Sequence, residues 1–173
     1  VGAAGVTRKR SRPARMEHTE TAAPCYDLVY ASPRPELFFK ASPHRVSGHG
    51  EPLRIRKDSE WNVPEPEMTL VLNSKLQLVG FTIGNDMSSR DIEGDNPLYL
   101  PQAKVYNQCC GLGPWITLPV GMPAREATNI HLVIRRGGKG EFSGKNSSDP
   151  VDRTYENIIV LLWRCESSPR SAV

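Results

Sequence analysis

Two glutamates, Glu65 and Glu67, stand one residue apart at the start of an apolar run, 68–72. Residues i and i+2 of a β-strand point to the same face, so a strand here places the two carboxylates side by side. A turn-forming Asn-Ser-Lys and a second apolar run, 76–83, lead to Asp86. If the two runs pair as an antiparallel hairpin, Asp86 returns to the end that carries the glutamates. Three converging carboxylates repel one another, and a hard divalent cation such as Mg²⁺, Ca²⁺ or Mn²⁺ relieves that repulsion.

A solvated strand end is the alternative interpretation of the same three acids. Carboxylates at strand ends are common and usually exposed, and there they need no cation. Residue types and spacing alone therefore leave both a metal site and a solvated strand end open.

A lysine, Lys104, follows the hairpin after an acidic, turn-forming segment, 93–97. This segment predicts a loop, and residues 101–103 favour entry into a strand, so we expect Lys104 at a strand end. The predicted loop is long enough to bring the lysine back over Asp86. A surface lysine is the alternative, because most lysines are exposed.

The segment 36–40 reads Glu-Leu-Phe-Phe-Lys and lies between turn-forming residues. It predicts a short strand, and alternation along that strand puts Glu36, Phe38 and Lys40 on one face. A phenylalanine between two charges is typical of a pocket wall. An edge strand protected by charged side chains is the alternative.

Taken in chain order, these motifs resemble a known enzyme family. Glu-x-Glu and the hairpin are followed by Gly-Asn-Asp-Met-Ser-Ser-Arg-Asp at 84–91, by Lys104 and by Gly-Pro-Trp at 113–115. This order resembles the fumarylacetoacetate hydrolase family, and within it the 2-keto-3-deoxy-D-arabinonate dehydratase type, from about residue 2 to about residue 164. The resemblance implies a mainly β fold with some α-helix (α+β), a β-roll or mixed β-sandwich that is incomplete here at both termini.

The resemblance also implies roles for individual residues. Glu65, Glu67 and Asp86 match the family's ligands for a magnesium or calcium ion. Lys104 matches a catalytic lysine that acts near C3 of the substrate, and Glu36 matches an acid that handles the proton on the leaving hydroxyl. A nearby dication disfavours protonated lysine, so we expect some neutral amine of Lys104 at pH 7.

The implied substrate is a 2-keto acid whose carboxylate and keto oxygen chelate one divalent ion. The ion acidifies the C3 proton, because the enolate charge develops on a metal-bound oxygen. Substrate binding is expected of Lys40, Arg90 and Lys104. Arg90 is also near enough in sequence to pair with Asp91, and the sequence leaves both partners open.

The implied activity is that of a metal-dependent dehydratase, a lyase that acts on a 2-keto-3-deoxy sugar acid through a metal-chelated enolate. Two alternatives stay open. One is a C–C bond hydrolase of the same family acting on a diketo acid or acylpyruvate, and the other is a catalytically incomplete metal-binding fragment. A homo-oligomer is expected, because the family tends to dimerise.

The composition of the 173-residue chain is that of one globular domain with an ordinary core: 38% of its residues are hydrophobic and 24% charged. Its 15 prolines and 14 glycines indicate many turns and short, mainly β elements. Strands are predicted at 111–119 and 130–134, with a Gly-Gly turn after the second. Helices are predicted at 7–20 and from Asp149, the latter with an apolar core-packing face at 155–163.

The expected division of the chain is an N-terminal linker or helical remnant at 1–30 and a C-terminally truncated catalytic domain at 31–173. The net charge of +3 is concentrated in the basic residues of 8–15. Charge so confined predicts no nucleic-acid partner. No apolar run reaches the ~20 residues of a membrane helix, so no membrane partner is expected. The four cysteines contain no C-x-x-C pair, and this favours buried thiols in the cytoplasm over a structural zinc site.

Overall fold

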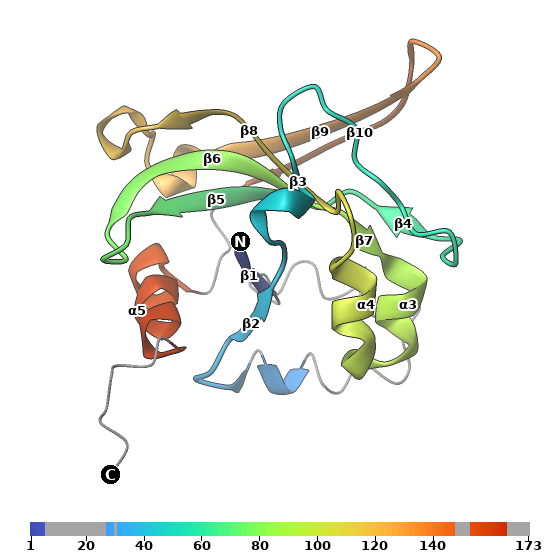
Figure 1. Cartoon of the computed structure of the whole chain (residues 1–173). Helices are drawn as coiled ribbons and strands as arrows, with labels where there is room; N and C mark the ends of the chain where they lie inside the picture. Colours follow the sequence, from blue (N-terminus) through green and yellow to red (C-terminus); the bar gives the residue numbers. More distant parts are fainter. Residues whose placement is uncertain (6–26, 30, 148–152, 166–173) are drawn as a thin grey trace.

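The structure is a computed structural model that describes residues 1–5, 27–29, 31–147 and 153–165 (Figure 1). Its strands are β1 (Gly2–Gly5), β2 (Glu36–Phe39), β3 (Val46–Ser47), β4 (Asn62–Val63), β5 (Pro66–Leu72), β6 (Leu78–Asp86), β7 (Ser88–Ser89), β8 (Cys110–Thr117), β9 (Asn129–Arg136) and β10 (Lys139–Ser147). Its helices are α3 (Arg90–Asp95), α4 (Leu100–Lys104) and α5 (Tyr155–Cys165), and its 3₁₀ turns are η2 (Pro43–Arg45), η3 (Pro97–Tyr99), η4 (Pro119–Gly121) and η5 (Arg125–Ala127). The predominance of strands confirms the mainly β prediction.

The β5–β6 hairpin is the centre of the fold, within a four-stranded sheet of order β3-β8-β6-β5 (Figure 1). The two strands pair antiparallel, with Glu67 opposite Gly84, which confirms the predicted hairpin. The second strand begins at Leu78 rather than at residue 76. The Asn73 side chain accepts hydrogen bonds from the backbone N–H groups of Lys75 and Gln77, and Leu76 has a φ of 57°, so the turn takes two more residues than predicted.

The predicted strands after the hairpin are confirmed. β8 runs antiparallel to β6 and places Cys110 opposite Asp86. β9 and β10 form a second antiparallel hairpin that projects from the sheet in Figure 1. Its turn is made by Gly137 and Gly138, whose φ values of 54° and 80° lie in the left-handed region that glycine adopts without strain.

The segment between Asp86 and β8 differs from the prediction. The residues expected as a loop form α3 and η3, and the residues expected to enter a strand form α4, so Lys104 ends a helix. Asn96 caps η3 by accepting the Leu98 N–H. Pro101 is in the first turn of α4, where a backbone N–H would have no helical hydrogen-bond partner. A proline is therefore compatible with the start of a helix here, and it does not mark entry into a strand.

At the N-terminal side, residues 2–5 were expected in a linker, but they form β1 and pair antiparallel with β2, with Gly5 opposite Glu36. The helix predicted at 7–20 and the start of the one predicted from Asp149 lie outside the described residues. The division of the chain at residue 30 stays a prediction.

The core centres on Ala41, Cys109 and Cys110, each at most 3% exposed. The last two are free, buried thiols, as predicted. α5 confirms the predicted helical face at 155–163, but the helix begins at Tyr155 and not at Asp149, because residues 153–154 are not helical. Its Tyr155 ring contacts the Phe81 ring of β6 at a centroid distance of 5.6 Å. Within the described ranges, no helix is long and apolar enough to cross a membrane.

Candidate metal centre and active site

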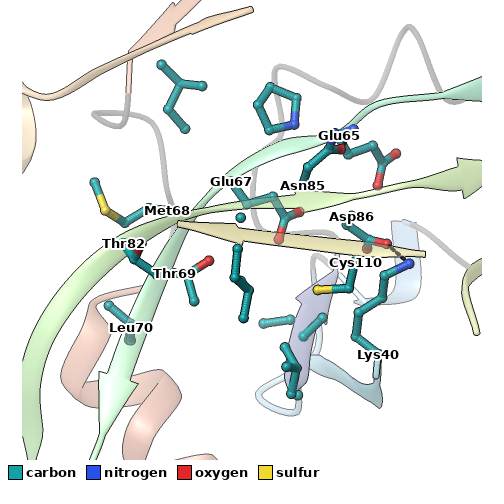
Figure 2. Close-up of a pocket in the computed structure, with 18 of the residues that line it drawn as sticks. Lys40, Glu65, Glu67, Met68, Thr69, Leu70, Thr82, Asn85, Asp86 and Cys110 are labelled. Carbon is teal, nitrogen blue, oxygen red and sulfur yellow. Dashed lines mark hydrogen bonds and ion pairs between the residues drawn. The ribbon is translucent and has the colours of Figure 1, made fainter. Parts of the chain in front are cut away.

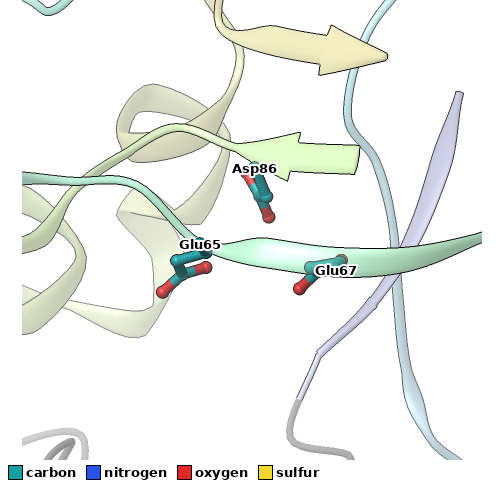
Figure 3. Close-up of side chains that lie close together, drawn as sticks. All are labelled: Glu65, Glu67 and Asp86. Carbon is teal, nitrogen blue, oxygen red and sulfur yellow. The ribbon is translucent and has the colours of Figure 1, made fainter. Parts of the chain in front are cut away.

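Three carboxylates converge at the open end of the β5–β6 hairpin (Figure 3). Glu65 stands just before β5, Glu67 is within β5, and Asp86 is the last residue of β6. The Asp86 N–H donates to the Glu65 carbonyl oxygen at 2.9 Å, which fixes the hairpin end. One ligand oxygen of each side chain lies within 4.8 Å of the others, so the predicted convergence is confirmed.

The chemistry of this donor set fits a hard divalent cation. All three ligand groups are carboxylates, the type that Mg²⁺, Ca²⁺ and Mn²⁺ prefer. Asp86 is 5% exposed, whereas Glu67 is the most exposed of the three. An ion between these acids would lie against a buried anion on one side and a more exposed one on the other.

Lys104 contacts two of the three carboxylates. Its Nζ lies 2.7 Å from Oε2 of Glu65 and 3.1 Å from Oδ2 of Asp86, and it donates to the Ser88 hydroxyl at 2.6 Å. Burial disfavours its ammonium, but the charges of Glu65, Glu93 and Asp86 outweigh burial and raise the pKa of Lys104 above its ordinary value. The neutral amine expected from the sequence is therefore disfavoured while no cation screens these acids.

Lys40 also contacts the Asp86 carboxylate (Figure 2). Its Nζ lies 2.6 Å from Oδ1 of Asp86 and donates to the carbonyl oxygens of Met87 at 3.0 Å and Lys104 at 2.5 Å. The residue is 1% exposed. With two carbonyl acceptors and the Asp86 carboxylate around its ammonium, Lys40 is better suited to hold Asp86 than to bind a substrate.

Arg90, at the start of α3, joins Glu65 to α3. It donates to Oε1 of Glu65, and its Nη1 lies 3.3 Å from Oε2 of Glu93. Asp91, the alternative partner suggested by the sequence, accepts hydrogen bonds from the Ser59 hydroxyl and the Glu60 N–H. Several such bonds outweigh burial and lower the pKa of Asp91.

Glu36 lies on β2, a different strand from those that carry the candidate metal ligands. It is half-buried on β2, opposite Gly5 of β1, and it is outside the group of acids that could hold a metal. A side chain on Gly5 would collide with the Glu36 carboxylate, so that carboxylate lies against the β1 backbone. Phe38, from the same face of β2, does reach the site: its ring centroid lies 5.7 Å from Nζ of Lys104.

Sequence reasoning missed two residues of this cluster. Ser88 accepts from Lys104, and Glu93 is 7% exposed with Oε1 at 3.9 Å from Nζ of Lys104. The i, i+3 spacing of Arg90 and Glu93 indicates an ion pair if the segment is helical. Because this segment was predicted to be a loop, the spacing did not indicate the pair.

The carboxylates open into a groove of about 1370 Å³. Near the acids its wall is polar and includes Thr69, Asn85 and Arg90. Farther away the wall becomes apolar, with side chains from β5, β9 and α5 such as Leu70, Leu132 and Ile158. The three carboxylates therefore lie at the polar end of a groove that is apolar elsewhere.

Comparison with known proteins identifies the family. Residues 14–160 match the family model described as fumarylacetoacetate (FAA) hydrolase C-terminal. All 173 residues align at 40% identity with a probable 2-keto-3-deoxyxylonate dehydratase of Haloferax volcanii, covering 59% of that protein. A 2-dehydro-3-deoxy-D-arabinonate dehydratase of Saccharolobus solfataricus is 43% identical over 148 residues, 86% of this chain and 50% of that protein.

Solved structures give the same result. A 2-keto-3-deoxyarabinonate dehydratase in a hexagonal crystal form superposes with a TM-score of 0.81 at 41% identity, over 87% of this chain and 52% of that one. A 2-keto-3-deoxy-D-arabinonate dehydratase complexed with magnesium and 2,5-dioxopentanoate gives a TM-score of 0.77 at 44% identity, over 79% of this chain and 49% of that one. The chain spans about half the length of these relatives. On sequence and fold together, it belongs to the fumarylacetoacetate hydrolase family.

Proposed function

We propose that this chain carries the metal-binding part of a magnesium-dependent dehydratase that removes water from a 2-keto-3-deoxy sugar acid. The convergence of Glu65, Glu67 and Asp86 at one end of the groove is the observation that carries the proposal. Its chemistry agrees with the relatives, which are named as dehydratases of 2-keto-3-deoxy acids, one of them in complex with magnesium. Because the chain spans about half of each relative, the activity is proposed for the protein as a whole.

Glu65, Glu67 and Asp86 would hold the cation, with Mg²⁺ preferred and Ca²⁺ or Mn²⁺ as substitutes. When bound, a divalent cation supplies Lewis acidity to the keto group and draws carboxylate charge away from Lys104. Arg90 lines the groove with a 17% exposed side chain, so it is the cation best placed to bind the substrate carboxylate. Lys40 keeps Asp86 in place.

Dehydration requires that one proton leave C3 and that the C4 hydroxyl depart with a proton, giving water and a C3=C4 double bond conjugated with the 2-keto group. We assign removal of the C3 proton to Lys104, whose Nζ lies beside Glu65, Asp86 and Ser88 and is therefore confined to the carboxylate end of the groove. Glu36 is the candidate for the acid that handles the proton on the leaving hydroxyl. Its position on β2 requires the substrate to extend from the carboxylates toward the β1–β2 pair.

An assay of the full reading frame that contains this chain tests the proposal. The protein is incubated with Mg²⁺ and 2-keto-3-deoxy-arabinonate, 2-keto-3-deoxy-xylonate or an acylpyruvate, with EDTA and Glu67→Gln as controls. We expect the protein to remove water from a sugar acid, and we expect this reaction to require both Mg²⁺ and Glu67. C–C cleavage of the acylpyruvate would contradict the proposal and support the hydrolase alternative. Mg²⁺ binding without turnover of any substrate would support the alternative of a catalytically incomplete metal-binding fragment. Light scattering on the same sample tests the expected homo-oligomer.

A further inference from the structure

Glu93 is a buried acid that no role described so far explains. Its side chain is 9% exposed, and its Oε2 faces Arg90 at 3.3 Å. Within the part of the chain that the structure describes, this Oε2 accepts no hydrogen bond. A buried carboxylate with unused hydrogen-bonding capacity is costly, so its presence points to a task beyond packing.

The cations of the site already occupy the carboxylates that would receive a metal. Lys104 bridges Oε2 of Glu65 and Oδ2 of Asp86, at 2.7 and 3.1 Å. A dication between the same acids repels the Lys104 ammonium, and this repulsion is strong where water is scarce. The ammonium therefore needs another anionic partner when the metal enters.

Glu93 is suitably placed to be that partner. Among the described residues, it is the one acid outside the metal group that forms an ion pair with Lys104, at 3.9 Å. This distance is longer than a hydrogen bond, and a shift of about 1 Å brings the two groups into hydrogen-bonding range. α3 and α4, which carry the two residues, contact each other, so both ends of this pair are anchored.

We propose that Glu93 is a positioning residue that receives the Lys104 ammonium when a divalent cation binds Glu65, Glu67 and Asp86. The proposal rests on the metal site of the proposed function. Its consequence is that metal binding and lysine placement are coupled: the entering cation moves Lys104 off Glu65 and Asp86, and Glu93 keeps it beside the metal.

A double-mutant cycle tests this coupling by calorimetric titration with MgCl₂. Glu93→Gln is measured in the wild-type chain and in a Lys104→Met background, with Asp95→Asn, an exposed acid on the same helix, as the control. In the wild-type background, Glu93→Gln should weaken Mg²⁺ binding about fivefold, as coupled charged neighbours do, because Lys104 then stays on the metal carboxylates. In the Lys104→Met background the penalty should largely disappear, and Asp95→Asn should have little effect in either.

The cycle separates this role from a simpler one. If Glu93 only adds negative charge near the metal, its removal costs the same affinity with and without Lys104, and equal penalties overturn the inference. If the wild-type chain binds no Mg²⁺, the proposed function fails as well. Circular dichroism checks folding. If Glu93→Gln does not fold, Glu93→Asp replaces it, because the shorter side chain withdraws the carboxylate from Lys104 and the same background dependence is expected.

Discussion

The ammonium of Lys40 lies 2.6 Å from Oδ1 of Asp86 in an ion pair almost closed to solvent, with side chains 2% and 6% exposed. Lys104 lies 3.1 Å from the other oxygen of the same carboxylate. The most buried acid of the candidate metal site is therefore held between two lysines. This arrangement fixes the direction of the Asp86 carboxylate before any ion arrives.

Replacing Lys40 should destabilise the fold. Lys40→Met leaves Asp86 with one cationic partner, and breaking a buried ion pair typically costs about 3 kcal/mol or more. Denaturant unfolding of the variant should show a loss of this order, whereas the exposed Lys75→Met should change stability by less than about 0.5 kcal/mol. An unchanged midpoint for Lys40→Met would mean that the Lys40–Asp86 pair contributes no net stability.

Removing the charge of Glu67 should weaken metal binding. Oxygen ligands hold hard cations chiefly through charge, so Glu67→Gln should lower Mg²⁺ or Ca²⁺ affinity at least several-fold in a calorimetric titration. Glu141→Gln, on the exposed β10 strand, is the matched control and should bind as the wild type does. Equal affinity in Glu67→Gln and wild type would exclude this residue as a ligand.

Lys104→Met should sharply lower the turnover of protein that still folds and still binds the metal. Loss of a general acid or base typically costs at least ~10²-fold in rate. The exchange of the substrate's C3 hydrogen with solvent deuterium, followed by NMR, should slow in parallel, because it requires the base but not the leaving group. Exchange at the wild-type rate without dehydration would transfer the role of base to Glu36.

Stability should fall between about pH 9 and pH 11, partly through one thiol. Burial raises the pKa of Cys110 from 9.0 to about 11. In this window the folded protein keeps the thiol proton, whereas the unfolded chain has lost it, so the folded state loses on the order of 2 kcal/mol by pH 11. Below pH 9 both states are protonated and the contribution is fully present.

Urea unfolding of wild type and Cys110→Ala at pH 8.5 and pH 10.5 measures this effect. The variant should lose less stability between the two pH values than the wild type does, even if the missing side chain lowers its stability at both. Burial also raises the pKa of Tyr106 to about 12, so part of the alkaline loss should remain in the variant. Identical losses in the two proteins would show that Cys110 does not titrate in this window.

Residue types and spacing were enough to predict the hairpin and the convergence of three acids. Two apolar runs around a turn pair in one register, and the period of two along a strand then fixes which carboxylates meet. The order of the motifs also determined the family, which the family model and the relatives confirm.

The surroundings of those acids depend on contacts between residues that are distant in the sequence. Pro101 is compatible with both a strand entrance and the first turn of a helix, and contacts distant in sequence selected the helix that carries Lys104. Ser88 and Glu93 became part of the site because α3 and α4 pack beside the hairpin end. The protonation preference of Lys104 depends on how many acids lie within a few ångströms, a quantity that spacing along the chain does not encode.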